Sequence, residues 1–145
     1  MTSPTTELLE RYYRAFNDGD LDAMAECVAD DVEHHVNQGE VRRGKDAFRE
    51  FNEAMAKHYS EQLSDLVLLT EPSGGRAAAE FWVDGAYRVT AEGLPPARGQ
   101  KYRLRAGTFF SIHGGKITRI ATAYNLTDWI AQVDGSASIS AEGAR

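Results

Sequence analysis

The chain has 145 residues, of which 42% are hydrophobic and 26% are charged. This is the length of one domain, and a chain of this size buries about two thirds of its unfolded surface. No apolar run approaches the ~20 residues that span a bilayer, which argues against a membrane protein. The excess of 22 acidic over 16 basic residues argues against a nucleic-acid binder.

The single cysteine, Cys27, excludes an intramolecular disulfide and a multi-cysteine zinc site. The N-terminal residues 1–4 have neither the basic nor the apolar region of a secretory signal, so we expect a cytoplasmic protein. We expect no metal and no cofactor. The adjacent His34 and His35 point to opposite faces of a strand, unlike metal ligands spaced four residues apart on a helix.

Hydrophobic periodicity and turn residues predict the elements of the chain. Ser3 and Pro4 are typical of a helix start, and the glycine of Asn17-Asp18-Gly19 is typical of its end. The expected elements are helices over 4–16, 21–28 and 44–59, strands over 32–36, 66–70, 77–90, 102–112 and 117–124, and a closing helical turn over 126–133. We expect residues 1–134 to form one domain and the small, polar tail over 135–145 to be disordered.

The pattern changes from helical to alternating after the third expected helix. That helix carries one apolar stripe, made of Phe48, Phe51, Met55 and Tyr59. The long strand over 77–90 has one apolar face (Phe81, Val83, Tyr87, Val89) and one polar face (Glu80, Trp82, Asp84, Arg88). Helices followed by antiparallel strands indicate an α+β domain with the helices on one side of a bent sheet. Such a sheet leaves a cone-shaped space, so we expect a pocket.

Several segments resemble the nuclear-transport-factor-2-like superfamily, and within it the steroid-isomerase-related, SnoaL-like polyketide cyclase group of small bacterial proteins. They are 12–22 (YYRAFNDGDLD), 29–32 (ADDV), 34–39 (HHVNQG), 44–48 (GKDAF), 92–100 (EGLPPARGQ), 115–117 (GKI) and 124–129 (YNLTDW). The resemblance runs from about Glu7 to Val133. It implies a cystatin-like α+β roll, in which a cone-shaped, curved, mixed or antiparallel sheet wraps around three N-terminal helices. It also implies an apolar pocket and, usually, a homodimer.

The catalytic positions of the best-known relatives are only partly filled. Ketosteroid isomerases use an Asp base, a Tyr donor and a protonated Asp donor. The resemblance matches the tyrosine to Tyr12, but it puts the base near Val36 and the second donor near Gly107. The Asp-Arg-Asp set of limonene epoxide hydrolases falls near Phe81, Val83 and Thr122. Neither acid set is therefore present.

SnoaL-like cyclases use a histidine or an aspartate on an acidic carbon, and this chain offers His34. The resemblance places His34 and Gln38 toward the pocket, together with Tyr12. We predict His34 as general base or acid, and Tyr12 and Gln38 as hydrogen-bond donors to a carbonyl oxygen. The residues expected to contact the substrate are Phe51, Met55, Phe81, Val83, Arg105, Ile120, Thr122 and Tyr124.

Each catalytic candidate also has a structural explanation. His34 fits a core or rim histidine, Tyr12 fits a core tyrosine, and Gln38 fits a turn before a glycine. Two functions therefore stay open. One is a cofactor-free enzyme of the isomerase or cyclase type, which moves a proton next to a carbonyl of an apolar substrate. The other is a non-catalytic module that binds or carries an apolar ligand.

A third hypothesis is an association domain that works through the outer face of the sheet. We expect a homodimer interface there, around Glu80, Trp82 and Asp84, since a large aromatic residue on a sheet surface is typical of interfaces. This hypothesis predicts a cone filled by side chains rather than a ligand-sized cavity.

Overall fold

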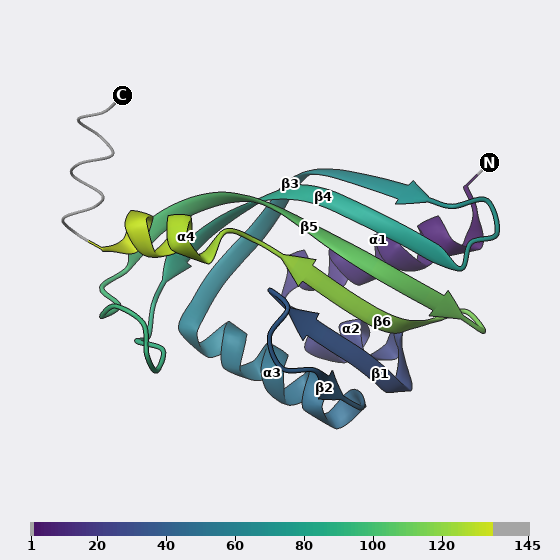
Figure 1. Cartoon of the computed structure of the whole chain (residues 1–145), viewed down its shortest axis with the longest axis horizontal. Coiled ribbons are helices and arrows are strands. Elements are labelled where there is room, and N and C mark those ends of the chain that lie inside the picture. The colour runs from purple at the N-terminus through teal and green to yellow at the C-terminus, as the bar shows by residue number, and fades with distance from the viewer. Residues whose placement is uncertain (1, 135–145) are drawn as a thin grey trace.

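The computed structural model describes residues 2–134, so the tail predicted to be disordered lies outside the described residues. The elements in chain order are α1 (Pro4–Asp18), α2 (Leu21–Glu26), β1 (Val28–Val36), β2 (Arg42–Arg43), α3 (Lys45–His58), β3 (Tyr59–Thr70), β4 (Arg76–Tyr87), β5 (Gln100–His113), β6 (Lys116–Ala123) and α4 (Leu126–Val133). The strands arch over α1, α2 and α3, and α4 lies at one end of the sheet (Figure 1). This arrangement confirms the predicted α+β fold.

The six strands form one sheet in the order β2-β1-β6-β5-β4-β3. β1 pairs with β6 in parallel, while all other neighbours are antiparallel, so the sheet is mixed. β3 is an edge strand, whereas β1 is paired on both sides. Three strands therefore separate β1 from β3, and the curvature of the sheet makes these two strands opposite walls of the concave face.

Alternation along the two longest central strands separates an inner from an outer face. The buried, inward side chains are Ala79, Phe81, Val83 and Tyr87 of β4 and Tyr102, Leu104, Ala106, Thr108 and Phe110 of β5. They pack against the apolar face of α1, where Leu8, Leu9 and Tyr12 are buried. None of the helices within residues 2–134 is long and apolar enough to cross a membrane.

The boundary between the second helix and the first strand differs from the prediction. α2 ends at Glu26, and residues 29–31, expected to end that helix, lie within β1. Val28 is fully buried and pairs with Ile117, so strand pairing there takes the place of further helical turns. The register shifts between Val28 and Glu33, which accommodates the acidic residues between them. The two-residue strand β2 was not predicted.

Two further predicted boundaries were wrong, the start of β3 and the end of β4, and these two positions pair with each other in the sheet. β3 begins at Tyr59, which was expected in the third helix, and not at 66. β4 ends at Tyr87 rather than at Thr90. Arg88, expected on the outer face, lies beyond that end, where its backbone N–H donates to the His58 carbonyl and the residue borders the cavity described below.

Candidate functional site

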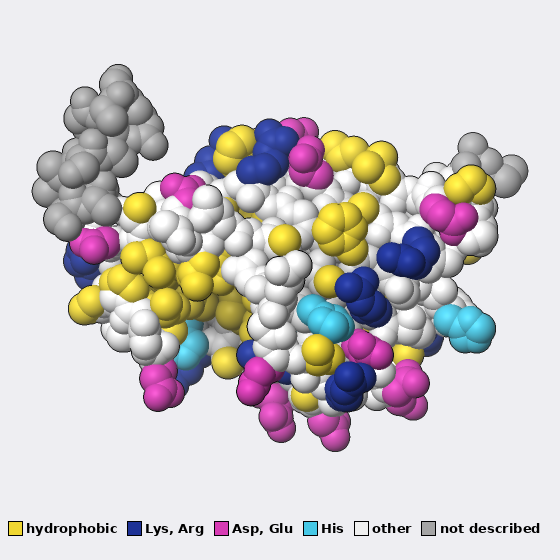
Figure 2. Space-filling model, in the orientation of Figure 1, with side chains coloured by type: hydrophobic (Ala, Val, Ile, Leu, Met, Phe, Trp, Pro, Cys, Tyr) yellow, Lys and Arg dark blue, Asp and Glu magenta, His cyan; other side chains and the backbone are white. Residues whose placement is uncertain are grey.

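A cavity of about 430 Å³ lies between the concave face of the sheet and the helices α1 and α3. This volume is typical of small-molecule sites. Apolar side chains gather over α4 and the loop beneath it (Figure 2), and Leu94 and Leu126 of these segments line the cavity. Of the residues predicted to form the site, the ones that line it are Tyr12, His34, Phe51, Met55, Phe81, Val83, Thr122 and Tyr124.

Three predicted site residues do not line the cavity. Gln38 lies in the turn after β1, where it and Asn37 have φ of 60° and 50°, and this turn carries it past the end of the strand. Arg105 points to the outer face, where its Nη1 donates to Glu80 Oε1 at 3.1 Å. Ile120 is only 1% exposed and belongs to the core.

His34 lies on the cavity side of β1 and is almost fully enclosed. Its side chain packs edge-on against Phe51 and Phe48, with ring centroids 4.7 and 5.4 Å away. Burial, and to a smaller extent the positive charge of Arg42, lowers the pKa of His34 to about 4. The imidazole is therefore neutral at pH 7. Its Nδ1 is buried without a hydrogen-bond partner among the described residues.

His35, the neighbouring histidine, lies on the other face of β1. It is not among the residues that line the cavity, and its Nε2 lies 3.4 Å from Glu33 Oε1. The two histidines therefore differ as expected for successive residues of a strand.

Tyr12 lies at the floor of the cavity within an aromatic cluster. Its ring contacts Tyr13 and Phe110 edge-on, with centroids 5.1 and 6.1 Å apart. Burial raises the pKa of the Tyr12 phenol well above its ordinary value. The hydroxyl therefore keeps its proton and is a neutral hydrogen-bonding group.

The cavity wall also holds a carboxylate that was not predicted from the sequence. Glu61 lies on β3 and lines the cavity, and its Oε2 accepts a hydrogen bond from the Tyr102 hydroxyl. Burial raises the pKa of Glu61, and the Tyr102 hydrogen bond opposes that rise. The alternation of Tyr59, Glu61 and Leu63 was the available signal, but the polar residues among them concealed it and the strand was expected to begin only at 66.

A glycine makes the contact between Glu61 and Tyr102 possible. Glu61 pairs with Gly85 of β4, and Gly85 pairs with Tyr102 of β5. A Cβ at Gly85 would lie 2.3 Å from the Tyr102 ring. Since Gly85 has no side chain, the Tyr102 ring crosses the middle strand and reaches the carboxylate on the far side.

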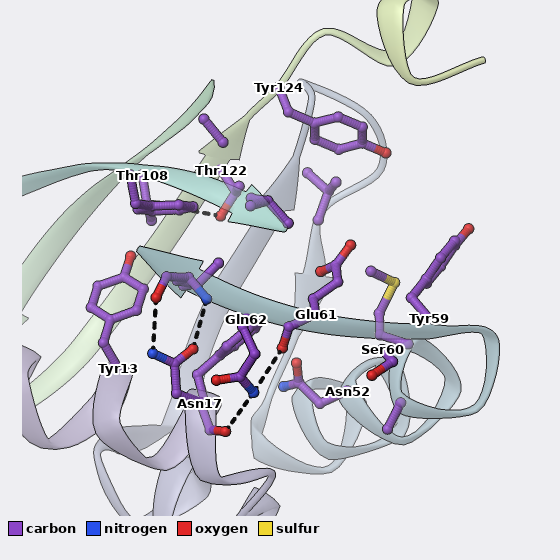
Figure 3. A pocket seen from close by; sticks show the side chains of 18 of the residues that line it. Tyr13, Asn17, Asn52, Tyr59, Ser60, Glu61, Gln62, Thr108, Thr122 and Tyr124 are labelled. Carbon is purple, nitrogen blue, oxygen red and sulfur yellow. Dashed lines mark hydrogen bonds between the residues drawn. The ribbon is translucent and has the colours of Figure 1, made fainter. Parts of the chain in front are cut away.

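Two more tyrosines lie beside this carboxylate. The Glu61 side chain points into the space beside Tyr59 and Tyr124 (Figure 3). Burial raises the pKa of Tyr59 to about 12, with smaller contributions from Tyr124, Tyr87 and Glu61. The pKa of Tyr124 is raised by burial and then by the Glu61 charge. The β3 wall therefore offers one carboxylate among neutral phenols.

Asn17 holds the β3 wall in place. Its Nδ2 donates to the Leu63 carbonyl at 3.1 Å, and its Oδ1 accepts from the Leu63 N–H at 2.8 Å (Figure 3). The Asn17 carbonyl also accepts from Gln62 Nε2 at 2.7 Å. Asn17, which the sequence placed only in the segment that ends the first helix, thus supplies the pairing that an edge strand lacks on its open side.

The polar groups on the cavity wall fit acid–base and hydrogen-bonding chemistry. Within residues 2–134, no three His, Cys, Asp or Glu side chains lie close enough together to hold a metal ion. The groups that can meet a ligand include a neutral imidazole on β1, a carboxylate on β3, neutral hydroxyls between them and the polar side chains of Asn52 and Arg88. One of the hydroxyls is that of Thr122, which lies 3.1 Å from that of Thr108.

Comparison with known proteins points in one direction. A model of the SnoaL-like domain matches residues 9–120. Three solved structures provisionally named polyketide cyclases each superpose with a TM-score of 0.88. The protein from Xanthomonas campestris pv. campestris is 47% identical, with 90% of this chain and 97% of that chain covered. The Pseudomonas putida protein is 48% identical (92% and 99% covered), and that of a Silicibacter species 49% (90% and 95%). A search of the curated proteins finds no significant match.

Proposed function

The chain belongs to the SnoaL-like domain family of the nuclear-transport-factor-2-like superfamily, and from this we propose that its cavity binds an apolar carbonyl compound and moves a proton next to the carbonyl. The reaction would be of the isomerase or cyclase type. The observation that carries the proposal is the position of His34, a neutral imidazole at the cavity wall, packed against Phe48 and Phe51. Family membership alone does not select a reaction, because the same fold hosts many functions.

His34 is the base in this proposal. Because its Nδ1 is buried, only Nε2 can reach a ligand; for Nε2 to act as the base it must carry the lone pair, so we assign the ring proton to Nδ1. The proton leaves the carbon for Nε2, and the electron pair of the C–H bond moves into an enolate. Tyr12, which keeps its proton, donates a hydrogen bond to the enolate oxygen. Nε2 exchanges this proton with solvent and returns a proton to carbon, so no reactant other than water is needed.

Deuterium exchange tests this mechanism. Methyl naphthyl ketone is an apolar ketone with an exchangeable methyl group next to its carbonyl, and it is small enough for a cavity of about 430 Å³. In deuterated water the protein should speed the loss of the methyl proton signal. The rate should stay constant from neutral pH down to the region of pH 4, where the ring of His34 becomes protonated.

The variants His34→Gln and His35→Gln form a matched pair, since the two residues are adjacent on one strand and only His34 lines the cavity. Exchange should fall to the uncatalysed rate in His34→Gln and remain in His35→Gln. Exchange that survives in His34→Gln while the ketone still binds would contradict the mechanism.

A second candidate function is binding without chemistry. It is favoured by the low pKa of His34, since a base with a pKa of about 4 takes a proton from carbon poorly. Saturable binding of the ketone with no exchange in the wild-type protein would support a carrier. The ligand-sized cavity counts against the third hypothesis, which predicted a cone filled by side chains.

We also propose a homodimer through the outer face of the sheet. Trp82 lies there between two guanidinium groups, those of Arg103 at 4.2 Å and Arg105 at 4.5 Å, and each arginine pairs with an acid of the same face. These pairs neutralise the charges around the indole. Next to them, Leu69 and Phe109 lie on either side of Ala78 in the strand register and are 62% and 54% exposed.

Trp82, whose charged neighbours are paired, and the exposed Leu69 and Phe109 beside it form a surface that suits contact with the same face of a second copy. Sedimentation should therefore give a dimer for the wild-type protein and a monomer for Trp82→Ala. Glu53→Ala, on an exposed position of α3, should remain dimeric. A monomeric wild-type protein, or a dimer that persists in Trp82→Ala, would contradict this interface.

A further inference from the structure

The wall formed by β3 carries a polar group that the proposed proton transfer does not use. Glu61 accepts one hydrogen bond, from Tyr102 to Oε2, and no other bond to this carboxylate is found within residues 2–134. Figure 3 shows the side chain directed into the cavity, beside Tyr59 and Tyr124. One carboxylate oxygen is thus oriented by the protein, and the other can take a donor from a ligand.

The opposite wall is formed by β1, which lies three intervening strands away in the sheet. His34 and Glu61 both line the same cavity, so a ligand that fills it can meet the imidazole at one side and the carboxylate at the other. A carboxylate recognises a hydrogen-bond donor, whereas the proposed role of His34 and Tyr12 concerns a carbonyl. The two walls are therefore suited to different functional groups of the same ligand.

The surroundings of Glu61 favour a neutral donor over a cation. An aromatic site for a cation needs open ring faces. Four of the nearby rings instead pack on one another: Tyr59 stacks on Tyr87, and Trp129 packs edge-on against Tyr59, Tyr87 and Tyr102. Tyr87 and Trp129 are also almost completely buried. A carboxylate alone could also bind an ammonium group, but a hydroxyl group gives up less hydration on entering a largely apolar cavity, so the neutral donor is favoured.

We propose that Glu61, oriented by Tyr102 across Gly85, is the specificity-determining residue of the cavity and accepts a hydrogen bond from a phenolic or enolic hydroxyl of the ligand. The ligand class is then a carbonyl compound with a hydroxyl at its far end. The inference rests on the proposed function only in that the cavity must bind a carbonyl compound. It does not require that a reaction takes place.

A pair of ligands isolates this contact. The first is methyl naphthyl ketone with a hydroxyl on the ring far from the acetyl group, and the second is the corresponding methyl ether, which lacks the donor. A hydrogen bond to a carboxylate changes affinity by a factor of about ten to a hundred. Fluorescence titration of the wild-type protein should therefore show the hydroxyl compound bound at least ~10-fold more tightly than the ether.

Variants then assign the preference to Glu61. Glu61→Met removes the acceptor and should leave the two ligands bound within about twofold of each other. Glu61→Gln keeps the Tyr102 contact and a weaker, neutral acceptor, so it should reduce the preference without abolishing it and serves if Glu61→Met is unstable. Glu53→Gln, an exposed glutamate outside the cavity lining, should keep the full preference. The affinity for the ether should be the same in all four proteins.

The outcomes separate this inference from the proposed function. If the hydroxyl compound is preferred through Glu61 but no deuterium exchange occurs, the proton transfer is wrong and the recognition role of Glu61 stands. If exchange depends on His34 but both ligands bind equally to the wild-type protein, the role of Glu61 is wrong and the proton transfer stands. If neither ligand binds, both are wrong.

Discussion

His34 and Glu61 are both largely buried, but the two walls of the cavity give them different surroundings. On β1 the imidazole faces the rings of Phe48 and Phe51, and its buried Nδ1 has no partner within residues 2–134. On β3 the carboxylate accepts a hydrogen bond from Tyr102. Burial lowers the pKa of the first group and raises that of the second, so in both cases it favours the neutral form.

The difference lies in what opposes burial. At His34 the charge of Arg42 adds to the effect, since it too disfavours a protonated ring. At Glu61 the Tyr102 hydrogen bond works against it and supports the charged form. The β1 wall is therefore suited to a group that stays neutral, and the β3 wall to a carboxylate that can exchange a proton or accept a hydrogen bond.

The largest expected effect concerns the stability contributed by His34. Its pKa is about 4 in the folded protein and 6.5 ordinarily, so between these values the unfolded chain binds a proton that the folded protein does not. The free energy of unfolding must then rise with pH over this interval, by about 3 kcal/mol at most. Urea unfolding from pH 4 to pH 7 measures this rise.

The matched substitutions of the two histidines provide the control. His34→Gln should remove this part of the pH dependence, while His35→Gln should retain it. An equally steep dependence in His34→Gln would mean that other groups cause it, and that the β1 wall is less enclosed than its geometry indicates.

The next effect tests how the β3 wall is built. In Gly85→Ala the new methyl group would overlap the Tyr102 ring, so the ring must move and the Glu61 contact must break. We expect a loss of about 2 kcal/mol in the free energy of unfolding. Gly107→Ala is the control, since a Cβ there meets only the Ala79 carbonyl at 3.4 Å. Similar losses in both variants would contradict the role of Gly85.

The general architecture could be predicted because it depends on repeated patterns. The apolar stripe of the third helix and the alternation around Phe81 and Val83 each involve several residues that agree. His34 and Thr122 line the cavity, where strand alternation and the superfamily resemblance both placed them, and Tyr12 lines it where the resemblance placed it. Patterns of this kind survive an error of a residue or two at an element's end.

The predicted positions that differ from the structure each depend on a single residue. Gln38 would line the cavity only if β1 continued straight, but positive φ at two residues turns the chain there. Arg105 alternates with buried residues on β5 and so faces outward, where the ion pair with Glu80 holds it. Glu61 was overlooked because an inward carboxylate breaks the apolar alternation that identifies a strand. Its partner Tyr102 is distant in sequence, and only the register across Gly85 brings the two together.

A smaller effect is expected from the clamp that holds β3. Asn17→Ala removes both side-chain hydrogen bonds to Leu63 and leaves its backbone groups on an open sheet edge. We expect a loss of about 1–2 kcal/mol in stability and faster amide hydrogen exchange at Leu63. The His34 wall should be unaffected, because β1 is paired on both sides. Faster exchange in β1 as well would show that the two walls are not independent.

The smallest effect is the most specific test of the contrast between the walls. Tyr102→Phe removes only the hydroxyl that donates to Glu61, at a cost of about 1 kcal/mol in stability. Because that bond favours the charged carboxylate, its loss should raise the pKa of Glu61 further. Carbon NMR of the labelled carboxyl measures this directly. In Tyr59→Phe, which keeps the Tyr102 bond, the pKa should move much less. An unchanged pKa in Tyr102→Phe would mean that burial alone governs Glu61, and the two walls would then follow the same rule.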